Sequence, residues 1–172
     1  MIELATRLDR VNRAVGHVVC WAALLMLLVQ FVIVLARYVF GLSSIAAGES
    51  VLYAHALLFM AGAGYTLLID GHVRVDIFYA KGSPRAKALI DTIGHVGLLI
   101  PAMVALLVWS WPSVRNSWAI LEGPISVGGI PASFLLKSFI PLFCALVLLQ
   151  SLACLLRAVA VLRGRDAEAT PT

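Results

Sequence analysis

Residues 14–36, AVGHVVCWAALLMLLVQFVIVLA, contain no Asp, Glu, Lys or Arg in 23 positions. A helix rises about 1.5 Å per residue and the hydrocarbon core of a bilayer is about 30 Å thick, so this run can cross a membrane. A helix also satisfies its backbone N–H and C=O groups within the segment, as lipid requires. The stretch therefore predicts a transmembrane helix.

Three more uncharged runs follow, at residues 50–69, 92–114 and 138–156. The last of these helices is expected to begin near residue 132, because Pro131 suits a first helical turn. The prediction is an all-α integral membrane protein whose residues 1–160 form one four-helix membrane domain, with transmembrane helices at about 14–36, 50–69, 92–114 and 132–156.

The composition agrees with lipid as the solvent. The chain is 62% apolar and 13% charged, whereas soluble domains carry about 25% charged residues. The sequence has no Gly-rich phosphate loop, nucleophile elbow or metal-ligand cluster, so neither an enzyme nor a bound cofactor or metal is expected. A net charge of +4 without a clustered basic patch does not indicate nucleic-acid binding.

The distribution of Lys and Arg sets the expected orientation. Ten of these residues lie in the N-terminal segment, the middle loop and the C-terminal tail, and three lie near the other two loops. Basic residues favour the cytoplasmic side. Both termini, the loop at residues 70–91 and the tail at residues 161–172 are therefore expected in the cytoplasm.

Two segments next to the spans look interfacial. Leu4, Leu8, Val11 and Val15 form one apolar stripe along residues 1–13 and the start of the first span, which favours a helix on the membrane surface over an extension of that span. The spacing of four residues predicts two ion pairs along this helix, Glu3–Arg7 and Asp9–Arg13. The loop stretch DGHVRVDIFY at residues 70–79 alternates charged and apolar side chains. The basic residues expected to reach lipid phosphates are Arg7, Arg10, Arg13, Lys81 and Lys87.

Polar residues near the outer face form a second group. Glu49 begins the second span and is interpreted as a cap or as a partner for Arg37 or Lys137. These three residues are expected to contact another subunit at the outer face.

Small residues and a proline shape two of the spans. Ala61, Gly62 and Gly64 make a smooth patch late in the second span, where another helix can approach closely. Packing within the chain is the simpler interpretation, and contact with a partner subunit is the alternative. Pro101 is expected to kink the third span.

The motif GHVRVD at residues 71–76, directly after the second span, resembles the small membrane subunit of tripartite ATP-independent periplasmic (TRAP) transporters, the DctQ-like family. Glu49 and the stretch GGIPASFLLKSFIPLF at residues 128–143 are similar to that family as well. The family signature on the cytoplasmic side maps to Gly71, His72, Arg74 and Asp76.

The resemblance implies an inner-membrane scaffold subunit of a bacterial transporter. Its partners would be a large membrane subunit, which carries the substrate and sodium sites, and a periplasmic solute-binding protein, with organic acids as the solutes. Two alternatives remain open. His17 and His95 lie at similar depths and would suit a haem-binding membrane anchor of an oxidoreductase, and Glu49 would suit a small autonomous multidrug exporter.

Overall fold

The structure, a computed structural model, describes residues 2–73, 79 and 82–164. The described residues contain no strand; they form the helices α1 (Ile2–Phe40), α2 (Ile45–Leu68), α4 (Pro84–Gly94), α5 (Ile100–Ala119) and α6 (Ser133–Leu162), with a π-helical turn, η1 (His95–Leu99), between α4 and α5. Taking α4, η1 and α5 as one continuous segment, four helices are long and apolar enough to cross a membrane. The prediction of an all-helical chain with four such helices is confirmed.

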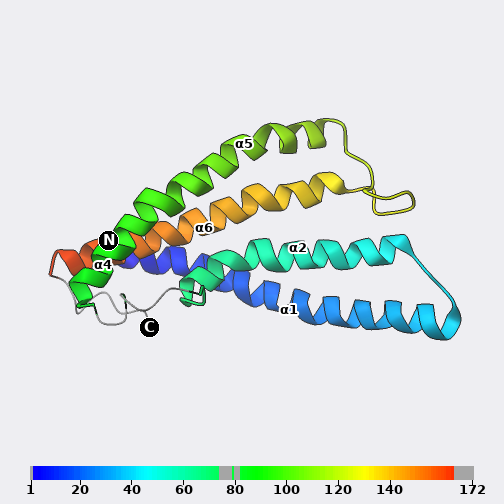
Figure 1. Ribbon diagram of the computed structural model, residues 1–172, viewed down its shortest axis with the longest axis horizontal. Coiled ribbons are helices and arrows are strands. Elements are labelled where there is room, and N and C mark those ends of the chain that lie inside the picture. The colour runs from blue at the N-terminus through cyan, green and yellow to red at the C-terminus, as the bar shows by residue number, and fades with distance from the viewer. Residues whose placement is uncertain (1, 74–78, 80–81, 165–172) are drawn as a thin grey trace.

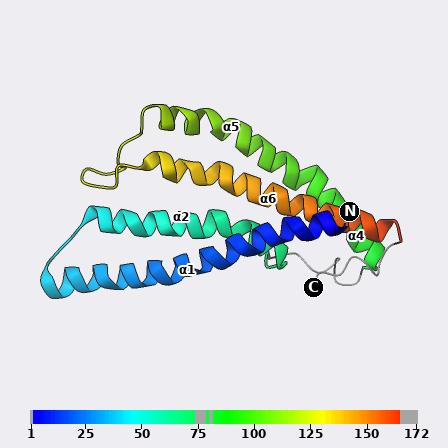
Figure 2. The same ribbon diagram turned by 180° about the vertical axis from the view of Figure 1, so that it is seen from behind.

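The helices lie side by side in the order α5, α6, α2, α1 (Figure 1). The first half of α1 crosses to α6, as Figure 2 shows from behind, so α6 contacts every other helical element of the described chain. We call the end where α1 begins and α6 ends the terminal end. The opposite end, with the α1–α2 and α5–α6 connections, is the loop end.

Local signals explain where the helices begin. Ser44 precedes α2 and its side chain accepts a hydrogen bond from the backbone N–H of Ala47 (3.3 Å). Ser83 does the same for α4 through the N–H of Ala86, and Pro84 occupies the first turn. Ser and Thr are favoured caps because their oxygens satisfy the orphan N–H groups of a first turn.

The third span departs from α-helical geometry next to Pro101. The N–H of Ile100 bonds to the carbonyl of His95, five residues back, which closes the π-helical turn. Proline has no N–H to donate, and its ring clashes with the carbonyl four residues earlier. The wider turn accommodates that ring, so the irregularity expected at Pro101 occurs in the turn just before it.

Residues 2–13 differ from the separate surface helix that the sequence favoured. They continue without a break into the first span, making α1 a single helix of 39 residues. The sequence has no Gly or Pro between Ile2 and Val15 to interrupt it, and Asp9 and Asn12 are buried. The extension of the span, not a separate element, is what the structure contains.

The patch of small residues on α2 faces the interior of the bundle. Ala61 is buried with Val19 of α1 and Leu146 of α6. A Cβ atom added to Gly64 would lie 3.1 Å from the Cβ of Leu146 and 3.0 Å from the Cγ of Asn12. The small side chains let the three helices approach closely. This face of α2 therefore packs against α1 and α6 of the same chain, which leaves no room there for a partner subunit.

Candidate functional site

A network of buried polar side chains joins α1 to α6 near the terminal end. Asn12 donates to the side-chain oxygen of Gln150 (2.9 Å), and Gln150 donates to Asp9 (2.9 Å). Arg157 donates to the other carboxylate oxygen of Asp9. Asp9, Asn12 and Gln150 are buried, so each bond forms where water cannot replace it.

A cavity of about 690 Å³ lies beside this network, between the end of α2, α4 and the last turns of α6. Figure 1 shows these elements converging at the terminal end. The cavity has charged and polar walls from Asp70, His72, Lys87, Asp91, His95 and Arg157. Its apolar walls include Leu67, Ile90, Ala158 and Val161.

The signature residue His72 lines this cavity because of how α2 ends. The N–H of Gly71 bonds to the carbonyl of Thr66 (2.8 Å) and the N–H of Asp70 bonds to that of Leu67 (3.3 Å). This is a Schellman motif, with Asp70 in the left-handed conformation (φ 60°). The turn places both Asp70 and His72 on the cavity wall. Arg74 and Asp76 lie outside the described residues.

The opposite wall belongs to α4. The Lys87 ammonium lies 5.3 Å from the centroid of the Tyr79 ring, and the Tyr79 hydroxyl donates to Asp91 (2.8 Å). Among the other predicted phosphate anchors, Arg7 is exposed and pairs with Glu3 (3.0 Å), and Arg10 and Arg13 are exposed on α1. Lys81 lies outside the described residues.

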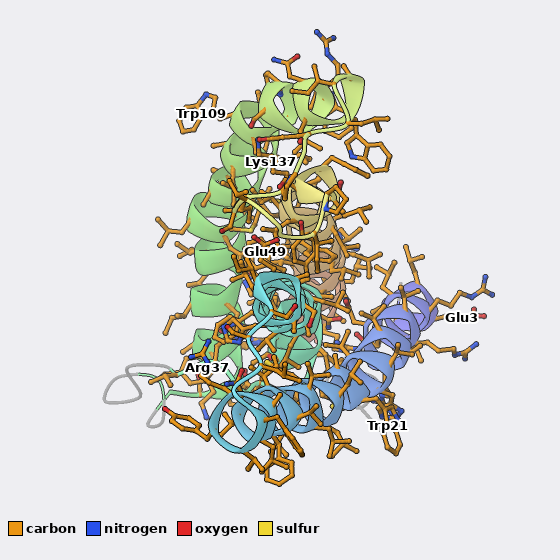
Figure 3. The ribbon with its side chains drawn as sticks, turned by 90° about the vertical axis from the view of Figure 1, so that its right-hand side faces the viewer. Glu3, Trp21, Arg37, Glu49, Trp109 and Lys137 are labelled. Atoms are coloured by element: carbon orange, nitrogen blue, oxygen red, sulfur yellow. The ribbon has the colours of Figure 1, made fainter. Side chains whose placement is uncertain are left out.

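Glu49 has a different role at the loop end from the one expected. Ser44, not Glu49, caps α2. The two oxygens of the buried Glu49 carboxylate accept from the backbone N–H groups of Ser126 (3.1 Å) and Ile130 (2.7 Å). Figure 3 shows Glu49 beneath the α5–α6 loop, while Arg37 lies apart from it near the end of α1.

Lys137 also has another partner. Its ammonium binds the carboxylate of Glu122 (2.5 Å), which accepts from the Ser117 hydroxyl as well. The hydrogen bond from Lys137, and then that from Ser117, holds the pKa of Glu122 below its ordinary value of 4.5. Of the three interpretations of Glu49 offered by the sequence, the cap and the pair with Lys137 are therefore wrong, because Ser44 caps α2 and the α5–α6 loop supplies other partners for Glu49 and for Lys137.

The two histidines considered for haem lie in different environments. His17 is exposed and meets the ring of Tyr65 edge-on, with 6.2 Å between ring centroids. His95 lines the cavity at the terminal end, and His17 is not among the residues of that wall. Within the described ranges, no group of three or more His, Cys, Asp or Glu residues is arranged to hold a metal ion.

Sequence reasoning missed the polar network and the cavity. The signal for the network was present, because Asn12 and Gln150 are amides next to or inside long apolar runs. Asp9 was instead expected to pair with Arg13, one helical turn away. The cavity had no such signal, because its walls come from three segments distant in the chain.

The comparison with known families points in the same direction as the signature motif. Residues 26–161 match the model described as tripartite ATP-independent periplasmic transporters, DctQ component. No curated protein and no solved structure gave a match to the chain. The match covers most of the chain, from residue 26 within α1 to residue 161 near the end of α6. The chain therefore belongs to the DctQ component family of tripartite ATP-independent periplasmic transporters and is a multi-pass inner-membrane protein.

Proposed function

We propose that this chain is the small scaffold subunit of a sodium-driven TRAP transporter that takes up organic acids. It braces the large membrane subunit and helps to dock the periplasmic solute-binding protein. The observation that carries the proposal is the family match over residues 26–161. A component of a tripartite transporter works with two other components, and this chain supplies the smaller membrane part.

The polar interior supports a helper role over that of a lone carrier. A carrier needs polar or charged side chains that face a solute route through the membrane. Here the buried Asp9, Asn12 and Gln150 bind one another, with Arg157 as the counter-ion of Asp9. Such a network fixes helices in place, which suits a stationary scaffold.

The apolar outer surface supports a membrane subunit with a large neighbour. Phe31 of α1 is 57% exposed and Trp109 of α5 is 80% exposed. Figure 3 shows that Trp21 and Trp109 project outward from α1 and α5. Contiguous apolar faces of this kind are covered by lipid or by another membrane protein, and the large subunit would cover part of them.

The proposed orientation places the terminal end in the cytoplasm and the loop end in the periplasm. The Lys and Arg bias supports it. Single cysteines provide the test, in a background without Cys20, Cys144 and Cys154. A membrane-impermeant maleimide should label Val127→Cys in intact spheroplasts and Asp76→Cys only after permeabilisation. Labelling of Asp76→Cys in intact spheroplasts would reverse the orientation.

The decisive test of function is reconstitution. The tagged chain, purified in mild detergent, should bring with it a much larger multi-span protein. Vesicles that contain both subunits and the binding protein should take up an organic acid only with an inward sodium gradient. Vesicles that contain this chain alone should show none, and sodium-dependent uptake by the chain alone would refute the scaffold role.

The signature motif offers a second test. Arg74→Glu inverts a charge at the expected phosphate level and should lower the yield of the complex, whereas Arg85→Glu on α4 serves as the matched charge inversion outside the motif. Equal yields and equal uptake for both variants would remove the role assigned to Arg74.

A further inference from the structure

We infer that the loop-end half of α1 docks a transmembrane helix of the large membrane subunit, through Gln30 and Arg37. The inference rests on the proposed function, because it names the surface that the larger component covers. Gln30 and Arg37 are seven residues apart in one uninterrupted helix, so they lie on the same side of it. Both residues are exposed, and neither has a hydrogen bond or ion pair with another residue of the described ranges.

Gln30 lies within the hydrocarbon of the bilayer. The uncharged run at residues 14–36 has its midpoint at residue 25, and a helix rises about 1.5 Å per residue, so Gln30 is about 8 Å from the bilayer centre. The half-thickness of the hydrocarbon core is about 15 Å. Acyl chains have no hydrogen-bonding group, which is why polar side chains at this depth face protein. The Gln30 amide therefore needs a partner that neither a lipid tail nor the described part of this chain supplies.

Arg37 lies at the boundary of the hydrocarbon. Its position seven residues further along α1 adds about 10 Å, which brings the guanidinium to the level of the headgroups. The two side chains together define the chemistry of the partner. A complementary helix carries an amide or hydroxyl side chain at the depth of Gln30 and a carboxylate two turns away, at the depth of Arg37.

Two other occupants fit this face less well. A phospholipid can pair its phosphate with Arg37, but its acyl chains leave the amide of Gln30 without a hydrogen bond. A second copy of this chain in the same orientation can pair Gln30 with its counterpart, but the same register brings the two Arg37 charges together. The large subunit has neither restriction, and the family of this chain consists of components of tripartite transporters.

The opposite edge of the bundle suits lipid. α1 and α5 are the outer helices of the layer (Figure 1). Residues 100–114 of α5 contain no Asn or Gln, and the Ser110 hydroxyl donates to the carbonyl of Leu107 in its own helix (3.3 Å). Trp109 projects outward from α5 (Figure 3), as tryptophans at a lipid interface do. An unpaired amide in the hydrocarbon therefore distinguishes the α1 edge from the α5 edge.

The first experiment compares variants of the full-length tagged chain, co-expressed with the large subunit and purified in mild detergent. Gln30→Leu should reduce the amount of large subunit retained by about tenfold, whereas Ser110→Ala on α5 should retain the wild-type amount. Arg37→Gln should also reduce retention, and Arg115→Gln, which changes an exposed arginine near the loop end of α5, should not. Wild-type retention in Gln30→Leu would overturn the inference, and equal losses in the two arginine variants would contradict the role of Arg37.

The isolated chain separates a lost contact from a lost fold. Gln30 has no hydrogen bond within the described chain, so Gln30→Leu should not lower the unfolding temperature measured by circular dichroism in detergent. A variant that unfolds earlier and also loses the large subunit would make the loss a folding defect and contradict the docking role. A wild-type chain that retains no large subunit would instead refute the proposed function, so the two failures give different results.

Photo-crosslinking in native membranes identifies the occupant. Position 34 lies on the face shared by Gln30 and Arg37, and benzoylphenylalanine there should crosslink to the large subunit, whereas the same group at position 108 of α5 should react with lipid. Val34 is 42% exposed and Val108 is 59% exposed, so both positions reach outside the chain. Crosslinks from position 34 to a second copy of this chain, or to lipid alone, would overturn the inference.

Discussion

Arg157 on α6 donates a hydrogen bond to the carboxylate of Asp9 on α1, across 148 positions of the chain. Gln150 binds the other oxygen of the same carboxylate. The first turns of the first helix are thereby fixed to the last turns of the fourth. The side chain of Asp9 is 8% exposed and that of Arg157 is 16% exposed, so each charge has little contact with water and depends on the other for compensation.

Asp9→Asn should lower the free energy of unfolding by roughly 3 kcal/mol, because removing one partner of a buried ion pair leaves the other charge uncompensated. The measurement is unfolding in mixed detergent micelles, followed by circular dichroism. Glu3→Gln is the matched control, since Glu3 and Arg7 form an exposed pair on the same helix that contributes only about 0–1 kcal/mol. Equal effects of the two substitutions would show that the Asp9–Arg157 pair is not specially stabilising.

The contrast between the two ion pairs shows what a sequence can and cannot reveal. The Glu3–Arg7 pair was expected from its spacing of four and is present. The same rule paired Asp9 with Arg13, whereas Asp9 faces α6. Spacing predicts neighbours along one helix, but it contains no information on which face of that helix a distant helix will cover.

The glycines of α2 give a second prediction. An added methyl group at Gly64 would meet Asn12 and Leu146, and Asn12 is held by its bond to Gln150. Gly64→Ala should therefore destabilise the chain by about 1–3 kcal/mol through overpacking. Gly62→Ala should remain within about 1 kcal/mol of the wild type, because its added methyl group would have a single neighbour at 3.8 Å. The same unfolding assay compares them, and equal stabilities would contradict the close approach at Gly64.

The existence of this packing face was predictable, but its closest contacts were not. Four small residues in a row at positions 61–64 indicate that a helix can approach. That Gly64 meets the amide of Asn12 depends on the register between α1 and α2. Gly16 meets Tyr65 at the same interface, where an added Cβ would lie 2.6 Å from the Cδ2 atom, and nothing in the local sequence of Gly16 indicated it.

Gly129 gives a third prediction, at the loop end. A Cβ atom there would collide with the Glu49 carboxylate, which cannot move aside without losing its bonds to Ser126 and Ile130. Gly129→Ala and Glu49→Gln should both speed amide hydrogen exchange at residues 126 and 130, by about tenfold if one charge-assisted bond is lost. Gly123→Ala is the control in the same loop, because an added methyl group there meets nothing.

Unchanged exchange at Ser126 and Ile130 in Glu49→Gln would show that the carboxylate does not organise the loop.

The four spans were predictable, because hydropathy and length are properties of each segment alone. The partners of Glu49 and Lys137 were not predictable, since they depend on how the Gly-rich α5–α6 loop folds back over α2.

The ion pair between Glu122 and Lys137 makes the α5–α6 loop sensitive to acid. Hydrogen bonds from Lys137 and Ser117 hold the pKa of Glu122 below its ordinary value of 4.5. Because the folded pKa lies below the unfolded one, the pair's contribution to stability is complete above about pH 4.5 and is lost as the pH falls through the folded pKa.

Amide exchange in residues 120–132, corrected for the intrinsic effect of pH, should stay constant down to about pH 4.5 and then quicken. Glu122→Gln should remove this step, and the Glu3→Gln chain should retain it. A step that persists in Glu122→Gln would assign the acid sensitivity to another group, since the only carboxylate bound to Lys137 among the described residues is that of Glu122.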